Sequence, residues 1–401
     1  MTAALATLLP AARERLPQIV DVRRRLHAQP EVGLQLPVTQ ALVVEQLREL
    51  GLEPRLGVRT SSATAVIEGG RPGPTVLLRA DMDALPLLEE TDLPFASATP
   101  GVMHACGHDT HVAMLLGGAR LLIERRELLA GNVLLMFQPG EEGFHGARVM
   151  LEEGLLEQAP GPVVGAFGLH IGTRHETGTV NLRPGALLAA GDTIRIRVRG
   201  RGGHASAPHL AADPITVAAE IVLALQTAVT RQIHAFDPAV ITIAHVTAGT
   251  TTNIIPETAF IEGTMRTVSD ETREAGRALI RRVAEGVAAA HGVSAEVELE
   301  PGYPVTYNDP DAVAEVERVT AAVAGTEVLR PMEHPIMGAE DFSYVLQRVR
   351  GAFAFIGARP AGLEPSTAPQ NHSNRVVFDE APMALGAALY AAMALHWLDG
   401  G

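Results

Sequence analysis

Apolar residues change their spacing once along this chain, and that change limits the folds open to it. Before residues 183–185, the expected strands, such as Val133–Phe137, are continuous apolar runs. Such runs are typical of parallel strands that are buried on both faces. After that point, Thr193–Arg199 alternates strictly between aliphatic side chains and arginine, which indicates a sheet with one face in water. The 401 residues are therefore predicted to form two domains built on different sheets.

The residues on both sides of the alternating segment have the pattern of an α/β domain. Apolar strands are separated by amphipathic helices, which predicts a mostly parallel sheet with helices on both faces. Helices are expected at 16–26, 39–50, 110–127, 147–153, 311–324 and 380–397, and strands at 63–67, 75–79, 133–137, 163–170 and 352–356. We expect this first domain to span residues 1–183 and 300–401, and to be the catalytic one.

Residues 184–299 are predicted to form a second domain inserted into the first. Its expected order is strand, helix, strand, strand, helix, strand, which is the split βαβ or ferredoxin-like pattern. The corresponding segments are 193–199, 215–232, 240–246, 259–266, 270–291 and 295–300.

Composition excludes several classes of chemistry. The sequence has no lysine, so Schiff-base lysines and phosphate-binding P-loops are excluded. A net charge of −14 argues against nucleic-acid and anionic-membrane partners. The single cysteine excludes a disulfide framework and a multi-cysteine metal site. We find neither a signal peptide nor an apolar run long enough for a bilayer, and therefore expect a cytoplasmic protein.

The densest polar cluster is the segment His104-Ala-Cys106-Gly-His108-Asp109-Thr-His111. Thiolate and imidazole are good ligands for borderline metals, and the spacing of Cys106 and His108 allows both to point at one site. The alternative is a plain helix N-terminus with a buried cysteine and surface histidines. So many polar groups need partners if they are buried, which favours a metal site.

A second signal is the pair Glu141-Glu142, directly after an apolar strand. Open α/β sheets place their ligands at this end of their strands. Adjacent carboxylates point in different directions, so one can bind a metal while the other acts on water. The alternative is a solvated loop, because such pairs are common.

Further polar residues follow other expected strands. Asp81 and Asp83 follow one strand and could bind a metal or orient a histidine ligand. His170 ends another strand, where a buried structural histidine is the alternative. His372 lies in a late polar loop, and the segment 337–342 is a polar break in an apolar context.

One segment suggests a different enzyme. Gly200-Arg-Gly-Gly-His204-Ala follows a strand and has the outline of a dinucleotide-binding fingerprint. However, Pro208 and Pro214 prevent a helix from starting directly there. An NAD-dependent oxidoreductase therefore stays as the alternative enzyme.

Taken together, these segments resemble the M20 metallopeptidase family. The closer match is its amidohydrolase branch, which holds hippurate hydrolases, N-acyl-amino-acid aminoacylases and auxin-conjugate amidohydrolases. The similarity runs nearly end to end. In chain order the matching segments are RADMDALP, HACGHDTH, QPGEEG, GLHIG, GRGGHASAPH, NIIPETAFIEGTMR, MGAEDF and NHSNRVVFDE.

The resemblance implies a hydrolase with two divalent metal ions per subunit, of zinc, manganese, nickel or cobalt. It implies that the thiolate of Cys106 bridges both ions. The further ligands it implies are His108 and His170 on one ion, and Glu142 and His372 on the other. The neighbouring Glu141 is implied to be the general base. Asp83 is the next candidate for a catalytic role, although we expect both Asp81 and Asp83 to orient ligands.

The inserted domain resembles the family's lid, which also dimerises. The resemblance implies that His204 reaches the active site of a partner subunit and stabilises the oxyanion, and that Asn253 and Arg266 hold the substrate carboxylate. It predicts hydrolysis of N-acetyl, N-benzoyl or similar N-acyl amino acids by a homodimer, with a tetramer as the alternative. The non-enzymatic alternative is a dimeric scaffold that binds metal without turnover.

Overall fold

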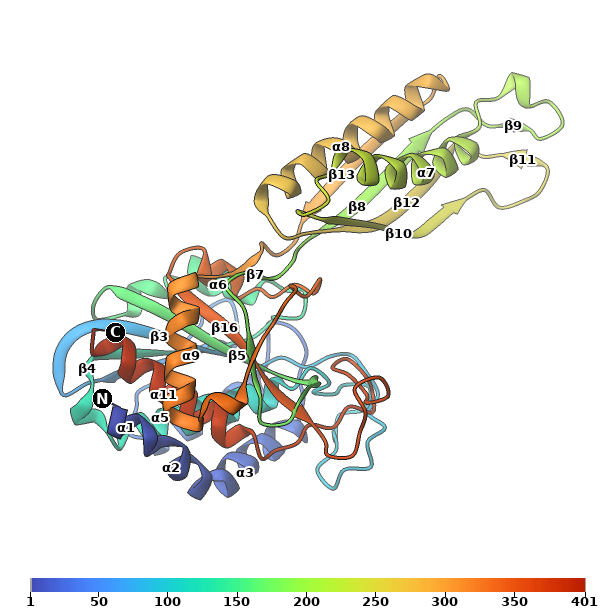
Figure 1. Cartoon of the computed structure of the whole chain (residues 1–401). Helices are drawn as coiled ribbons and strands as arrows, with labels where there is room; N and C mark the ends of the chain where they lie inside the picture. Colours follow the sequence, from blue (N-terminus) through green and yellow to red (C-terminus); the bar gives the residue numbers. More distant parts are fainter. Residues whose placement is uncertain (1, 401) are drawn as a thin grey trace. The chain divides into compact units, whose positions relative to one another are not determined.

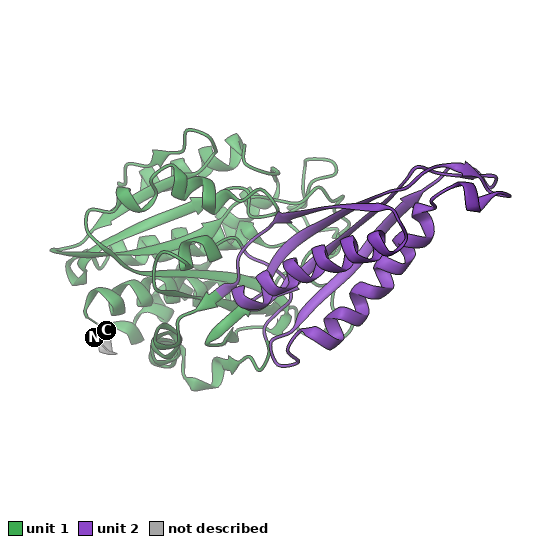
Figure 2. Ribbon diagram, turned by 90° about the horizontal axis from the view of Figure 1, so that it is seen from above, with its two compact units in different colours: residues 1–187, 307–334, 341–401 green, residues 188–306, 335–340 purple. Residues whose placement is uncertain are grey.

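The computed structural model describes residues 2–400, which divide into two compact units (Figures 1 and 2). Unit 1 contains the chain up to Leu187, residues Tyr307–His334, and the chain from Asp341 onward. Unit 2 contains Leu188–Thr306 and Pro335–Glu340.

Unit 1 is built on one eight-stranded sheet. In spatial order its strands are β1 (Arg55–Leu56), β2 (Ala63–Glu68), β4 (Ala130–Gln138), β3 (Arg71–Asp81), β5 (Val163–Glu176), β16 (Gly351–Arg359), β6 (Val180–Leu182) and β15 (Leu329–Pro331). The central strands β4, β3, β5 and β16 run parallel, whereas β1–β2, β2–β4 and β16–β6 are antiparallel. The predicted mostly parallel sheet is thus confirmed. The direction of β2 could not be predicted, because an apolar run does not encode strand direction.

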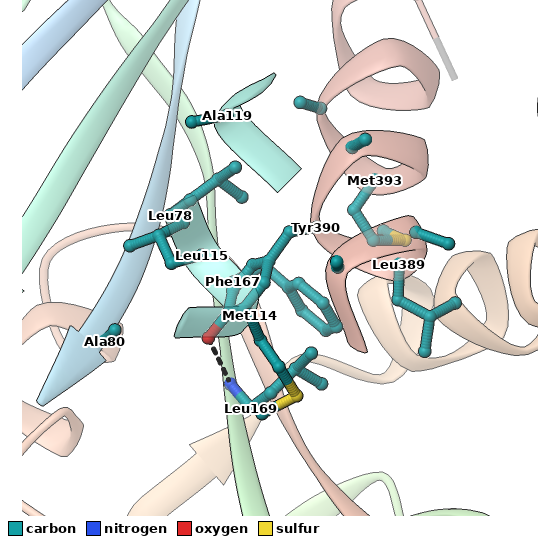
Figure 3. Close-up of a cluster of buried hydrophobic side chains, with 14 of the residues drawn as sticks. Leu78, Ala80, Met114, Leu115, Ala119, Phe167, Leu169, Leu389, Tyr390 and Met393 are labelled. Atoms are coloured by element: carbon teal, nitrogen blue, oxygen red, sulfur yellow. Dashed lines mark hydrogen bonds between the residues drawn. The ribbon is translucent and has the colours of Figure 1, made fainter. Parts of the chain in front are cut away.

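The helices of unit 1 include two long apolar ones, α5 and α11, which pack together against the central strands (Figure 3). The α-helices are α1 (Thr2–Ala6), α2 (Leu8–Glu14), α3 (Leu16–His27), α4 (Pro37–Glu49), α5 (His108–Ile123), α6 (Gly146–Glu152), α9 (Pro310–Ala324), α10 (Ser343–Leu346) and α11 (Met383–Leu398). Short 3₁₀ turns are η1 (Arg126–Leu128), η2 (Leu156–Gln158) and η4 (Thr326–Val328).

Alternation along β3 separates the core of unit 1 from its polar side. Leu78 and Ala80 point toward α5 and α11, where they join the main hydrophobic core (Figure 3). Because successive side chains of a strand point to opposite faces, Arg79 and Asp81 lie on the other face. A buried Tyr390 of α11 ties the strands in place. Its hydroxyl accepts the Leu169 N–H at 3.3 Å and donates to the Arg79 carbonyl at 2.7 Å.

Several elements of unit 1 differ in length from the sequence prediction, and β5 and α5 are two of them. Strand β5 continues beyond His170 to Glu176, because β16 keeps pairing with it as far as Arg359. Helix α5 begins at His108 and ends at Ile123, and the turn η1 takes up the rest of the expected helix.

Unit 2 has the predicted order β8-α7-β10-β12-α8-β13. Its antiparallel sheet is ordered β10-β12-β8-β13. The elements are β8 (Ala190–Arg199), α7 (Pro214–Gln232), β10 (Ala239–Ala248), β12 (Thr258–Thr267), α8 (Asp270–Ala290) and β13 (Ser294–Pro301). The aliphatic side chains of β8 pack with residues of α7 and α8, while its arginines Arg195 and Arg199 pair with glutamates of β12 and β13 on the wet face.

Smaller elements complete the chain. Strands β9 (Gly203–His204) and β11 (Ile254–Ile255) form a two-stranded ribbon in unit 2, followed by the turn η3 (Pro208–Leu210). Strands β7 (Gly185–Leu188) and β14 (Thr306–Asn308) form another two-stranded sheet.

Unit 2 starts at Leu188, after the expected start at 184, and extends past the expected end at 299 to Thr306, with Pro335–Glu340 added. Gly302 donates its N–H to the Gly191 carbonyl at 2.9 Å, and Gly191 donates to Tyr303 at 3.1 Å. The Ala189 N–H also donates to the carbonyls of Ile336 and Gly338. These backbone bonds join two later segments to the start of β8, which a linear sequence pattern does not reveal.

Candidate metal centre

The candidate metal centre lies in unit 1, at the carboxyl ends of its parallel strands. Asp81 is the last residue of β3 and pairs in register with Gln138, the last residue of β4. Glu141 and Glu142 follow β4 in a tight turn. Side chains at these ends meet at one edge of the sheet, where open α/β sheets bind their ligands.

The five predicted metal ligands are brought together here. Cys106, His108 and His170 form one group, and Cys106, Glu142 and His372 form another; within each group the ligand atoms lie within 4.8 Å of one another. Cys106 belongs to both groups. Its Sγ lies 3.3 Å from His170 Nε2, and His372 Nε2 lies 3.0 Å from Glu142 Oε1.

Some buried atoms of this cluster lack the hydrogen-bond partners that buried polar groups normally have. Neither ring nitrogen of His108 has a hydrogen-bond partner among the described residues, although the carboxylates of Asp81 and Asp83 lie 3.5 Å away. Glu142 Oε1 also lacks an aligned hydrogen-bond donor, although the His372 ring lies 3.0 Å away. Orphaned buried groups of this kind are costly unless a ligand satisfies them, so the cluster fits a divalent cation.

A bound cation would oppose the pKa shift of one ligand, Cys106, and agree with that of another, His170. Burial raises the pKa of the Cys106 thiol, and the nearby Glu142 carboxylate raises this pKa further. Burial lowers the pKa of His170, as do the neighbouring rings of His111 and His108. A divalent cation among these groups favours the thiolate and the neutral imidazole. Thiolate, imidazole and carboxylate together suit zinc and similar borderline metals.

Local backbone conformation presents two of the ligands. Gly107 has φ +89°, and a Cβ at this position would lie 2.5 Å from Ile171 Cγ2, so only glycine fits between Cys106 and His108. His372 has φ +71°, which is unusual for a residue with a side chain. The preceding Asn371 stabilises this loop by donating from Nδ2 to the carbonyls of Cys106, at 2.9 Å, and Ile171, at 3.0 Å.

Asp83 lies behind the glutamate pair. Its two carboxylate oxygens accept the backbone N–H groups of Glu141, at 2.9 Å, and Glu142, at 3.0 Å. It is fully buried. These contacts orient the glutamates and the His108 ring, so the geometry favours an orienting role for Asp83 over its grouping with the catalytic residues.

Asp81 supports the site through a different histidine. Asp81 Oδ1 lies 2.5 Å from His111 Nδ1, and the Ile171 N–H donates to His111 Nε2 at 2.8 Å. Both nitrogens of His111 are therefore used by the protein. Burial would raise the pKa of Asp81, but the charges of Arg79 and His108 outweigh it and hold this pKa well below its usual range.

The sequence patterns did not indicate roles for Arg79, Gln138, Asp341 and Asn371. The Arg79 guanidinium donates to Gln138 Oε1 at 2.8 Å and to Asp341 Oδ1 at 3.2 Å, and lies 2.9 Å from Asp81 Oδ2. Asp341 Oδ2 also accepts the Ala147 N–H at the start of α6. The signal for these residues was present, because all four lie in or beside the polar segments that mark the site.

The three remaining predicted residues lie in unit 2. His204 and Asn253 are neighbours on the β9–β11 ribbon, where the Ala205 N–H donates to the Asn253 carbonyl at 3.1 Å. Arg266 lies in β12, opposite Gly191 of β8. None of the five metal ligands lies in unit 2.

The structure gives no support to the dinucleotide-binding alternative. The glycines at 200–203 lead into β9, and α7 begins only at Pro214. Strand β8 is antiparallel to both of its neighbours, whereas the dinucleotide fold requires a parallel strand that leads into a helix N-terminus.

Among the helices of residues 2–400, none combines the length and apolarity that a bilayer crossing requires.

Comparisons with known proteins agree with the family resemblance seen in the sequence. Residues 77–396 match the model of peptidase family M20/M25/M40. Thermostable carboxypeptidase 1 of Saccharolobus solfataricus is 40% identical over 383 residues, covering 94% of this chain and 95% of the relative. N-acetyl-L-cysteine deacetylase of Bacillus subtilis is 39% identical over 340 residues, covering 85% of this chain and 80% of the relative.

A solved structure is also similar. It is a dinuclear metal binding peptidase of the M20 family from Bacillus subtilis, 34% identical, with a TM-score of 0.82 over 96% of this chain and 98% of that chain. With the family match over most of the chain and a metal-ligand cluster in unit 1, this chain belongs to peptidase family M20/M25/M40 and is a metal-dependent amidohydrolase.

Proposed function

We propose that this enzyme hydrolyses N-acyl amino acids to a carboxylate and a free amino acid, with two divalent ions per subunit. The observation that carries the proposal is that Cys106 is shared by two ligand groups, one with His108 and His170 and one with Glu142 and His372. A shared thiolate between two sets of ligands is the arrangement that a bridged pair of ions needs. Two adjacent ions are a recurrent solution for hydrolysis.

The names of the relatives support the substrate class. A carboxypeptidase and an N-acetyl-L-cysteine deacetylase have one chemical feature in common. Each acts on an amide bond whose amine side is an amino acid with a free carboxylate. An N-acyl amino acid has the same feature, and Arg266 and Asn253 are the residues that we propose to bind the carboxylate. Arginine suits this role because it can bind a carboxylate through two hydrogen bonds.

In this proposal the residues of the site divide the work. The five ligands would hold divalent ions, which would polarise the amide carbonyl and make water more acidic. Glu141 accepts the proton of the attacking water and passes it to the leaving amine. Its position next to a ligand, with its backbone N–H held by Asp83 at 2.9 Å, suits a base of fixed orientation.

We further propose that the enzyme is a cytoplasmic homodimer in which His204 of one subunit acts on the active site of the other. A free sheet edge supports dimerisation. Strand β10 is an edge strand of unit 2, and its Val240 and Val246 are 44% and 52% exposed. Unpaired edges with exposed apolar side chains are candidates for pairing with another chain.

The substrate and metal proposals are tested together. Metal-free enzyme is prepared with a strong chelator, reconstituted with Zn²⁺, Mn²⁺, Co²⁺ or Ni²⁺, and assayed with ninhydrin on N-acetyl and N-benzoyl amino acids. We expect restored release of amino acid and two ions per subunit. Within β5, His170→Ala should lose metal while the matched His175→Ala should keep it. Full activity after exhaustive chelation, or no activity on any N-acyl amino acid, would contradict the proposal.

The shared site has its own experiment. A His204→Ala dimer and a Glu141→Gln dimer are both expected to be inactive, and subunit exchange should restore activity to about a quarter of wild type. The reason is that half of the dimers are mixed and each mixed dimer has one complete site. No recovery after proven exchange would show that His204 does not act across the dimer.

A further inference from the structure

The His204 side chain is fixed by its own turn. Residues 204–207 form a tight turn after β9, closed by the Ala207 N–H donating to the His204 carbonyl at 2.8 Å. The ribbon with β11 holds the start of this turn, since Ala205 donates its N–H to Asn253 at 3.1 Å. The backbone of the turn is therefore bonded on both sides, and the His204 ring itself is exposed.

Inside the turn, Ser206 makes two contacts with one nitrogen of the His204 ring. The Ser206 N–H donates to His204 Nδ1 at 3.1 Å, and Ser206 Oγ lies 2.8 Å from the same nitrogen. A backbone N–H can only donate, so Nδ1 must offer its lone pair. In the neutral ring the proton is then on Nε2, which points a hydrogen-bond donor away from the turn.

We propose that Ser206 is a positioning residue, whose backbone N–H sets the tautomer of His204 and whose hydroxyl holds the orientation of the ring, so that Nε2–H is presented as a donor to a developing oxyanion. This inference rests on the proposed function, in which His204 stabilises the tetrahedral intermediate. A preorganised donor stabilises charge that develops in the transition state without a reorganisation cost. The opposite tautomer would present a lone pair to the oxyanion and would repel it.

The same chain contains an internal reference for this arrangement. The Phe236 N–H donates to His234 Nδ1 at 3.2 Å, across the same two-residue spacing. His234 thus has the backbone contact without a hydroxyl, because Phe236 stands where the other turn has Ser206. Comparing the two exposed histidines separates the effect of the N–H from that of the hydroxyl.

The experiment uses Ser206→Thr and Ser206→Val in the metal-loaded enzyme, because these side chains have the same shape and differ only in the hydroxyl. We expect Ser206→Thr to keep wild-type kinetics. We expect Ser206→Val to lose about 3- to 10-fold in kcat, the usual worth of one neutral hydrogen bond, with little change in KM and in metal content. Equal kcat for the two variants would overturn the positioning role.

A spectroscopic arm reads the tautomer without any substrate. In protein labelled with ¹⁵N-histidine, the ring nitrogen shifts of His204, assigned by their loss in His204→Gln, should show the proton on Nε2, with His234 as the reference. In Ser206→Val the backbone N–H still faces Nδ1, so we expect the proton to stay on Nε2 and only the Nδ1 shift to move, because one of the two contacts of this nitrogen is lost. A proton on Nδ1 of His204 in the wild type would overturn the inference. If instead the wild type failed to cleave N-acyl amino acids, the proposed function would fail while the shifts would still decide the tautomer.

Discussion

Two clusters of titratable side chains flank the first turn of α5, and they differ in how their members are paired. The ligand cluster consists of Cys106, His108, Glu142, His170 and His372. The anchor cluster consists of Arg23, His27, Glu89, Asp109 and Glu380. His108 and Asp109 are adjacent in sequence but belong to different clusters.

The difference lies in the contacts. Asp109 Oδ2 accepts from Arg23 Nε at 3.0 Å and lies 2.9 Å from His27 Nδ1, and Arg23 also donates to Glu380 at 2.7 Å. By contrast, His108 has no partner on either ring nitrogen among the described residues. Buried ion pairs thus connect α5 to α3 at Asp109, while the ring nitrogens of His108 remain available to an ion. Changes in the two clusters should therefore have different consequences.

The largest effects, on kcat and on metal content, are expected at Glu142 of the ligand cluster and at the adjacent Glu141. Glu141→Gln keeps the shape of the side chain and removes its basicity, so kcat should fall by about 10²- to 10⁴-fold with both ions retained. Glu142→Gln should lose metal, because a carboxylate ligand becomes an amide. Steady-state kinetics and metal analysis of the purified variants measure both outcomes. Near-normal kcat in Glu141→Gln would show that the base is another group.

In the anchor cluster, a substitution should lower the free energy of unfolding, by an amount comparable with the loss of activation free energy at Glu141. Asp109→Asn removes the charge that faces two buried cations, and breaking a buried pair costs about 3–5 kcal/mol. Urea unfolding of the metal-loaded enzyme should show this loss, while the metal content per subunit stays at the wild-type value. Loss of metal at unchanged stability would break the comparison, since Asp109 would then belong functionally to the ligand cluster.

The segment 104–111 shows how far the sequence could predict this arrangement. Its residues predicted a metal site, and the cluster around Cys106 and His108 supports that site. The same segment also supplies Asp109 to the anchor cluster and His111 to the support of Asp81. This division could not be predicted, because it depends on partner atoms from α3, β3 and β5, which lie far away in sequence.

His104 illustrates the same limit. It lies two residues before a ligand, yet it belongs to none of the described groups that could hold a metal. The ring is buried, and burial lowers its pKa to about 3, so the ring is neutral. The mostly parallel sheet and its polar edge were predictable because apolar runs and strand ends are local signals. Strand β2, the extension of β5 and the boundaries of unit 2 depend on pairing between distant segments, which local patterns do not encode.

A smaller effect is expected at Asp83, which contacts the ligand cluster without belonging to it. In Asp83→Asn, one oxygen is replaced by an NH₂ group that faces a backbone N–H of Glu141 or Glu142, so that N–H loses its acceptor. Changes to groups that orient ligands typically reduce metal affinity by about 10- to 100-fold. Metal titration should show this decrease, with kcat largely recovered at saturating metal. Wild-type affinity would mean that Asp83 does not orient the ligands.

The smallest effect is a pH dependence that should belong to the anchor cluster alone. Burial lowers the pKa of His27, but the carboxylates of Asp109 and Glu89 outweigh it and raise this pKa to about 9. The raised pKa means that the folded protein binds the His27 proton more tightly than the unfolded chain, whose histidines titrate near pH 6.5. The stability from this proton is complete below about pH 6.5 and is lost as the pH rises through about 9. The expected decrease between pH 7 and pH 9 is about 2 kcal/mol.

Urea unfolding of the metal-loaded enzyme measures this decrease, because bound ions keep the ligand histidines from titrating. His27→Gln should start from a lower stability and lack this slope, and Asp109→Asn should lose most of it, since the charge that retains the proton is gone. An equal slope in wild type and His27→Gln would assign the titration to other groups and leave the anchor cluster without a role in alkaline stability.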